Sequence, residues 1–275
     1  IIPTTRFSLR SDFRVSNIMF RLSLSWLPKP SSRKKNFLLL LAKQCMLSIK
    51  AKAKAEEHLN FQLLQHLEKP EQSVDIVSAY FVPEKIGADR LKKLADENIE
   101  VRVLTNSFKA NDVAVVHAFY AKYRQDLLEN DVQLYEFLAA PDADHLNANT
   151  AEISKKAKVS LKGLSRSSLH AKLMAIDQKQ VFIGSFNFDP RSAYLNTEIG
   201  VLLNSPSLAQ AVHQTMDQNL SKYAYKLVLD ANQNINWKIK KANGEVKTFT
   251  KEPGIRWYQK AGLKLMSWLP IEGFM

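Results

Sequence analysis

The stretch from Glu56 to Phe137 most constrains the fold, because helix-like and strand-like patterns alternate along it. Leucines spaced three and four apart predict a helix that ends before Pro70, and the apolar run Ser73–Val82 predicts a strand that Pro83 stops. The alternation then continues with a helix over 86–95, a strand over 100–105, a helix over 116–127 and a strand over 132–137. This order predicts an α/β fold, with a mixed, mainly parallel sheet flanked by helices on both faces.

Positive charge is concentrated at the beginning of the chain. The net charge is +12, but residues 1–54 hold twelve basic residues against one acidic residue, Asp12. Residues 55–275 hold the remaining 27 basic and 26 acidic residues, so this part is nearly neutral. A near-neutral body is poorly suited to binding a phosphate backbone, and the sequence therefore argues against nucleic acid as a partner.

Three interpretations compete for the basic segment 1–54. It could lie on an anionic membrane surface, since lysines flank the apolar run 37–41. It could be a targeting peptide, because it is rich in Arg and Ser and poor in acidic residues. It could also be sequence that does not belong to the fold, since it begins at Ile1 and lacks clean periodicity, and we favour this interpretation. The apolar run is far shorter than the roughly 20 residues that cross a bilayer.

The remaining sequence divides into a domain over 55–228 and an aromatic, basic tail over 229–275. Spacing within 208–220 predicts a further helix before the tail. Within the domain, Ala139–Ser168 is a polar connector whose lysines either help to hold a phosphate or belong to a solvated loop. In the tail, Trp237, Trp257 and Trp268 either contact a membrane interface or pack against the body, and we expect packing.

Neither a metal nor an organic cofactor is expected from the sequence. The single cysteine, Cys45, excludes a disulfide framework and a cysteine metal cluster, and it fits a reducing compartment. The chain shows neither a glycine-rich nucleotide loop nor a grouping of metal ligands.

The stretch from Ser168 to Leu203 carries the candidate chemistry. It predicts a strand, a tight turn, a second strand, a polar loop and a third strand. Because side chains alternate along a strand, His170 and Lys172 fall on one face and share a site. Asp177 has the opposite parity and falls in the turn, where it suits holding that turn or pairing with a nearby cation.

Hydrogen-bond donors follow this pair at regular spacing. Ser185 and Asn187 are two residues apart, and a hydroxyl and an amide can both donate to phosphate oxygens. Lys172 adds a compact positive charge. A histidine that acts as nucleophile or acid needs a partner that orients its other ring nitrogen, and Glu198 on the next predicted strand is the natural candidate.

Taken together, these residues form the pattern H-x-K-x4-D-x6-G-S-x-N followed by a glutamate, with Gly184 completing it. The pattern resembles the active-site signature of the phospholipase D superfamily. Three flanking stretches are similar to bacterial cardiolipin synthases, especially the C-terminal half of the C-type branch: Tyr80–Pro83, Ser185–Ala193 and Trp268–Glu272. The similarity runs from about residue 60 to residue 275.

The resemblance implies a metal-free phosphatidyltransferase that exchanges phosphodiesters through a phosphohistidine. It implies catalytic roles for His170, Lys172, Asp177 and Glu198, with the phosphate bound by Lys172, Ser185 and Asn187. The implied substrate is phosphatidylglycerol and the implied product is cardiolipin. The expected location is peripheral, on the anionic surface of a bacterial cytoplasmic membrane.

One departure from the family leaves three hypotheses open. Cardiolipin synthases carry two such motifs, and this chain has one, since no other histidine is followed by a lysine at the second position. The chain could be a fragment whose missing half carries the other histidine, in which case His170 is the general acid and base. It could be a homodimeric single-motif phosphodiesterase or nuclease. It could also be a lipid-binding remnant without catalysis.

Overall fold

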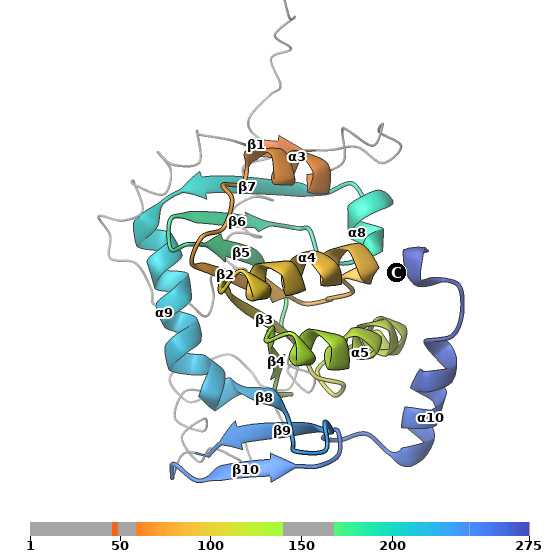
Figure 1. Cartoon of the computed structure of the whole chain (residues 1–275). Coiled ribbons are helices and arrows are strands. Elements are labelled where there is room, and N and C mark those ends of the chain that lie inside the picture. Colours follow the sequence, from red (N-terminus) through yellow and green to blue (C-terminus); the bar gives the residue numbers. More distant parts are fainter. Residues whose placement is uncertain (1–45, 49–58, 140–167, 242, 275) are drawn as a thin grey trace, which may run out of the picture.

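The computed structural model describes residues 46–48, 59–139, 168–241 and 243–274 (Figure 1). Its ten described strands form one sheet in the order β1-β7-β6-β5-β2-β3-β4-β8-β9-β10. The strands are β1 (Met46–Ser48), β2 (Ser73–Ser78), β3 (Glu100–Asn106), β4 (Gln133–Phe137), β5 (Lys172–Ile176), β6 (Gln180–Gly184), β7 (Ile199–Asn204), β8 (Ala224–Leu229), β9 (Ile235–Lys240) and β10 (Val246–Phe249). The helices are α3 (Leu59–His66), α4 (Glu84–Asp96), α5 (Ala114–Glu129), α8 (Pro190–Tyr194), α9 (Pro206–Tyr223), α10 (Trp257–Met266) and the 3-10 helix η3 (Glu272–Phe274).

The sheet is mixed, as expected for the α/β class, but parallel pairing is confined to its centre. The pairs β2–β3 and β3–β4 are parallel, and the other seven described pairs are antiparallel. The expectation of a mainly parallel sheet therefore holds only for the three strands that helices connect. Strands β5 and β6 are joined by residues 177–179, and so short a turn can only reverse the chain direction.

Helices cover both faces of the sheet, which confirms the layered arrangement expected from the sequence. On one face, apolar side chains of α3, α4 and α5 pack on the strands together with Ile76 and Met174. On the opposite face, α9 packs on a second core that includes Val77 and Leu173 (Figure 1). Side chains of neighbouring strand residues thus enter different cores, as strand geometry requires.

The tail is part of the sheet and does not merely lie on the domain. Strands β9 and β10 of the tail extend the sheet beyond β8, and α10 packs beside α5. Of the tail tryptophans, Trp237 is buried as expected, whereas Trp257 and Trp268 are 83% and 71% exposed. The expectation that these two pack against the body is therefore wrong.

A short piece of the N-terminal segment forms the edge strand β1 of the sheet. Residues Met46–Ser48 pair antiparallel with β7, so this piece of the segment does belong to the fold. The rest of 1–54, including Cys45, and the connector over 140–167 lie outside the described residues. Within the described ranges, no helix combines the length and apolar character needed to cross a membrane.

A buried cluster of charges fastens the tail to the helical face. The Arg124 guanidinium on α5 lies 2.9 Å from the carboxylate of Glu136 on β4 and 2.8 Å from that of Glu252 in the tail. The Nε2 atom of His117 lies 2.6 Å from the same Glu252 carboxylate. Burial opposes ionisation, but Arg124 and His117 together hold the pKa of Glu252 well below its usual value. Arg124 therefore neutralises two buried carboxylates from separate parts of the chain.

Replacing Arg124 by Met should destabilise the fold by about 3–5 kcal/mol, because Glu136 and Glu252 would remain buried without their shared cation. Urea unfolding followed by circular dichroism measures this loss. The matched control is Lys85→Met, which breaks a solvent-exposed pair with Asp89 and should leave the midpoint nearly unchanged. Equal midpoints for the two variants would contradict the role given to Arg124.

Candidate functional site

The residues of the sequence motif gather where several strand ends meet. Lys172 begins β5 opposite Ser78, the last residue of β2. Gly184 ends β6 opposite Gly200 near the start of β7. Because β5, β6 and β7 are antiparallel, the start of β5, the end of β6 and the start of β7 share one edge. This is also the carboxyl edge of the parallel strands β2 and β3, where α/β folds usually bind ligands.

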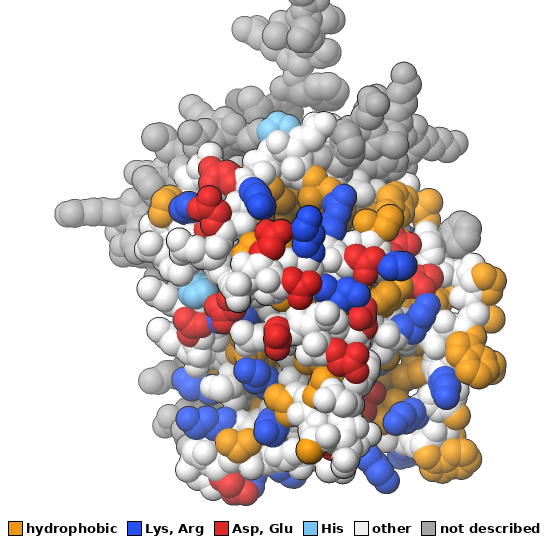
Figure 2. All heavy atoms as spheres, in the orientation of Figure 1, with side chains coloured by type: hydrophobic (Ala, Val, Ile, Leu, Met, Phe, Trp, Pro, Cys, Tyr) orange, Lys and Arg blue, Asp and Glu red, His pale blue; other side chains and the backbone are white. Residues whose placement is uncertain are grey.

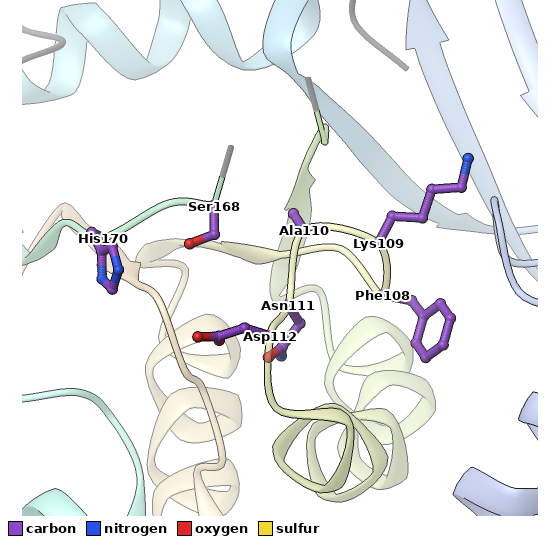
Figure 3. A pocket seen from close by; sticks show the side chains of 7 residues that line it. All are labelled: Phe108, Lys109, Ala110, Asn111, Asp112, Ser168 and His170. Atoms are coloured by element: carbon purple, nitrogen blue, oxygen red, sulfur yellow. The ribbon is translucent and has the colours of Figure 1, made fainter. Parts of the chain in front are cut away.

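Alternation of side chains places His170 on the same side of the sheet as Lys172, because Leu169 and Ala171 belong to the opposite core. The residues two and four positions after Lys172, Met174 and Ile176, belong to the core beneath α4 and α5. His170 itself is exposed. Its side chain borders a hollow (Figure 3). The residues that line this hollow are Phe108, Lys109, Ala110, Asn111, Asp112, Ser168 and His170.

Asn106, the last residue of β3, fixes the backbone just before His170. Its side-chain oxygen accepts a hydrogen bond from Leu169 N at 2.8 Å, and its Nδ2 donates to Leu169 O at 3.1 Å. The same Nδ2 donates to Ala79 O at 3.0 Å. The side chain is buried and joins three strand ends. Sequence reasoning missed Asn106, although a polar residue directly after a predicted strand is a usable signal.

Lys172 is a half-buried cation without an anionic partner in the described part of the chain. Its Nζ donates to His170 O at 3.1 Å, and no described carboxylate lies within ion-pair distance of it. Burial lowers the pKa of Lys172 below its usual value. Three more distant carboxylates act in the opposite direction, those of Glu198, Asp189 and Asp112. The Lys172 ammonium is therefore desolvated, and these carboxylates balance its charge only partly. Such a cation is suited to binding an anionic ligand.

Asn187 offers a second polar group to the site. Asn187 is 91% buried, and its side-chain oxygen has no hydrogen-bond partner among the described residues. Two positions later, Asp189 caps α8, its carboxylate accepting from Ser192 N at 2.7 Å. Burial raises the pKa of Asp189 to about 6. The loop is thus anchored by Asp189, and it holds Asn187 with its side-chain oxygen unpaired among the described residues.

Ser185 and Glu198 are arranged differently from the expectation. The Ser185 hydroxyl donates to the Glu198 carboxylate, and Asn196 Nδ2 donates to the same carboxylate at 3.1 Å. A hydroxyl carries one proton, so Ser185 cannot donate to a phosphate while it holds Glu198. No hydrogen bond joins Glu198 to His170 within the described ranges. Glu198 instead ties the end of β6 to the start of β7 and contributes negative charge near Lys172.

Residues 63–220 match the family described as cardiolipin synthase, PLD-like domain. The chain belongs to this family. It is 39% identical over 239 residues to cardiolipin synthase C of Escherichia coli (strain K12), covering 85% of this chain and 48% of that protein. It is 33% identical over 171 residues to an uncharacterised protein of Helicobacter pylori (strain 26695), covering 60% and 32%.

This member of the cardiolipin synthase family spans about half the length, or less, of the relatives it matches. Its fold is also similar to the crystal structure of phosphatidylserine synthase from Haemophilus influenzae Rd KW20, with a TM-score of 0.50 at 11% identity. That similarity covers 95% of this chain and 62% of the other. Across its described residues, the chain places no group of three or more His, Cys, Asp or Glu side chains where a metal could bind.

Asp177 does not join the other motif residues. It follows the last residue of β5, whereas His170 precedes the first, so the strand separates them. Its buried carboxylate accepts from the backbone N–H groups of Glu71, Gln72 and Ser73, at 2.9, 2.7 and 2.9 Å. This matches the turn-holding role expected from its parity and separates Asp177 from the candidate catalytic set. The carboxylate binds the β5–β6 turn to the beginning of β2.

Replacing Asp177 by Asn should lower the free energy of unfolding by about 1–3 kcal/mol, because an amide offers one acceptor oxygen to three backbone N–H groups. Thermal and urea unfolding measure this loss. The matched control is Asp131→Asn, at an exposed aspartate that shares the left-handed backbone conformation. A normal melting temperature for the Asp177 variant would contradict the anchoring role.

Proposed function

We propose that this chain is one half of a phospholipase D-type phosphatidyltransferase that makes cardiolipin through a phosphohistidine. Membership of the cardiolipin synthase family supports the reaction class. The observation that carries the proposal is the pair His170 and Lys172: an exposed imidazole, and a half-buried ammonium that donates to the backbone oxygen of His170 and lacks a described ion-pair partner. Such a pair suits attack on, or proton transfer at, a phosphodiester held by the cation.

The phosphate would be held by Lys172 and Asn187. An anionic oxygen beside Lys172 restores the interactions that burial removed from the ammonium. The Asn187 side chain adds an amide nitrogen, whose N–H groups can donate to a second oxygen. As negative charge develops on the phosphoryl oxygens during transfer, both groups gain interaction energy, which is how a fixed site accelerates the reaction.

The chemistry requires two histidines. A ring nitrogen of one attacks the phosphorus of phosphatidylglycerol, and the P–O bond to its glycerol head group breaks. The second histidine gives its proton to the leaving glycerol oxygen. It then takes a proton from a head-group hydroxyl of a second phosphatidylglycerol, whose oxygen attacks phosphorus as the P–N bond breaks. The products are glycerol and cardiolipin, and His170 supplies one of the two imidazoles.

The other imidazole comes from outside this motif. By the resemblance to the C-terminal half of the family, His170 is the general acid and base, and the nucleophile lies in the rest of a longer protein. A second copy of this chain is the alternative source, and it would give a homodimeric phosphodiesterase. We keep the homodimer as an alternative because the chain carries a single motif. The nearly neutral body over 55–275 argues against a nuclease.

His170→Ala should abolish turnover, because no other described group can replace an imidazole that transfers the phosphoryl group or its protons. The assay incubates phosphatidylglycerol vesicles with the protein, alone or with the N-terminal half of E. coli cardiolipin synthase C, and detects cardiolipin and glycerol by mass spectrometry. His66→Ala, at an exposed histidine on α3, is the control and should retain activity. Residual His170→Ala activity above about 1% of the unaltered protein contradicts the assignment.

Lys172→Met should lower kcat about a hundredfold to a thousandfold, since it removes a cation that stabilises charge in the transition state. Lys179→Met is the control, because Lys179 lies in the β5–β6 turn and is half exposed. Steady-state kinetics in the same vesicle assay measures both variants. An unchanged kcat for Lys172→Met, with normal folding, would mean that the phosphate binds elsewhere.

A further inference from the structure

The end of the tail presents a large apolar surface to solvent. We call it the α10 surface. Its members are exposed aromatic and aliphatic side chains in and just after α10: Trp257, Tyr258, Leu265, Met266, Trp268 and Leu269. Trp257 and Trp268 are 83% and 71% exposed, which is unusual for the largest apolar side chain. Large apolar side chains exposed together on one element mark a binding surface.

The geometry of α10 explains why this patch faces outward. At 3.6 residues per turn, Trp257, Tyr258 and Leu265 fall within about 100° of the helix circumference. Leu263, which is buried against the body, lies on the opposite side. The helix therefore uses one face to pack on the domain and leaves a second apolar face without a described partner. Figure 2 shows apolar side chains gathered along the side of the molecule where Figure 1 places α10.

Basic side chains accompany this apolar face. Arg256, Lys260 and Lys264 are exposed within or beside α10. The two acidic residues nearby are already engaged with the body, since Glu252 pairs with Arg124 and Glu272 pairs with Lys122. The surface thus combines tryptophan and leucine with uncompensated positive charge.

We propose that the α10 surface binds the protein to an anionic phospholipid bilayer by lying in the interface. Tryptophans with lysines along one amphipathic helix suit the boundary between acyl chains and head groups, where lysine side chains reach the lipid phosphates. A protein interface fits less well, because the cores of such interfaces are depleted in lysine. The inference rests on the proposed function in that a bilayer is where a phosphatidyl donor resides.

The position of the α10 surface relative to the hollow supports this occupant. Gly254, three residues before α10, lies against the Lys109 side chain so closely that an added Cβ would be 2.0 Å from Lys109 Cε. Lys109 lines the same hollow as His170 (Figure 3). The segment that leads into α10 therefore packs against one of the residues that form the wall of the hollow. A bilayer bound by α10 would bring lipid head groups toward the hollow.

The test is vesicle flotation of the full chain, with phosphatidylcholine vesicles that contain or lack phosphatidic acid. Phosphatidic acid supplies negative charge but has no head-group alcohol to exchange, so binding is read without turnover. Trp257→Ala combined with Trp268→Ala should weaken binding at least about tenfold. Lys260→Glu and Lys264→Glu should each weaken binding to anionic vesicles by at least about fivefold and reduce its salt dependence. Ile86→Ala with Val246→Ala, at exposed sites outside the surface, is the control.

Each outcome bears on the proposal. Binding by the unaltered chain that the tryptophan pair removes and the control pair retains supports it. No binding to anionic vesicles, or equal binding by the tryptophan variant, overturns it. The sedimentation coefficient of the protein without vesicles is measured as well. If the tryptophan substitutions change that coefficient but leave vesicle binding unchanged, the α10 surface joins copies of the chain, and the proposal also fails. His170→Ala separates the two proposals, since it should bind vesicles normally even if the proposed reaction is wrong.

Discussion

The site depends on the hydrogen bonds that the Asp177 carboxylate accepts. These come from three backbone N–H groups at and just before the start of β2, and they fix the β5–β6 hairpin against the central parallel strands. The resulting register places Lys172 opposite Ser78, at the end of β2. At this same edge, Asn106 of β3 holds the backbone of Leu169. A buried polar contact at each end of β5 therefore determines where the imidazole of His170 stands.

The charges of the domain fall into two groups that serve different purposes. In the buried clusters, opposite charges meet directly: Arg102 Nε lies 2.6 Å from Asp75, and Arg124 lies close to two carboxylates. Lys172 differs, because it is desolvated while its nearest carboxylates act only at longer range. An unpaired buried cation costs stability, and proteins retain such groups where a ligand supplies the missing charge. This contrast singles out Lys172 among the buried cations described.

Much of this arrangement could be predicted from the sequence, because it follows from local patterns. Periodicity gave the helices and strands between Leu59 and Phe137, and strand parity placed His170 with Lys172 and separated Asp177 from them. The antiparallel pairings, the strands of the tail and the Asn106 contact depend on which segments meet in space. The partner of Glu198 was missed for the same reason, since Ser185 and Asn196 compete for its carboxylate only once β6 and β7 pair. The exposure of Trp257 had no local signal at all.

The exposure of His170 is itself an argument for a site completed by a second surface. In the proposed reaction, a phosphohistidine must transfer its phosphoryl group to an alcohol in preference to water, and that selectivity depends on excluding water from the reacting atoms. An imidazole that stands exposed at the edge of the sheet does not meet this condition alone. A second half bearing the other histidine would supply the missing nucleophile and cover the hollow at the same time. Contact with a second half would thus both complete the pair of histidines and exclude water. We therefore favour a two-part site over a remnant that only binds lipid.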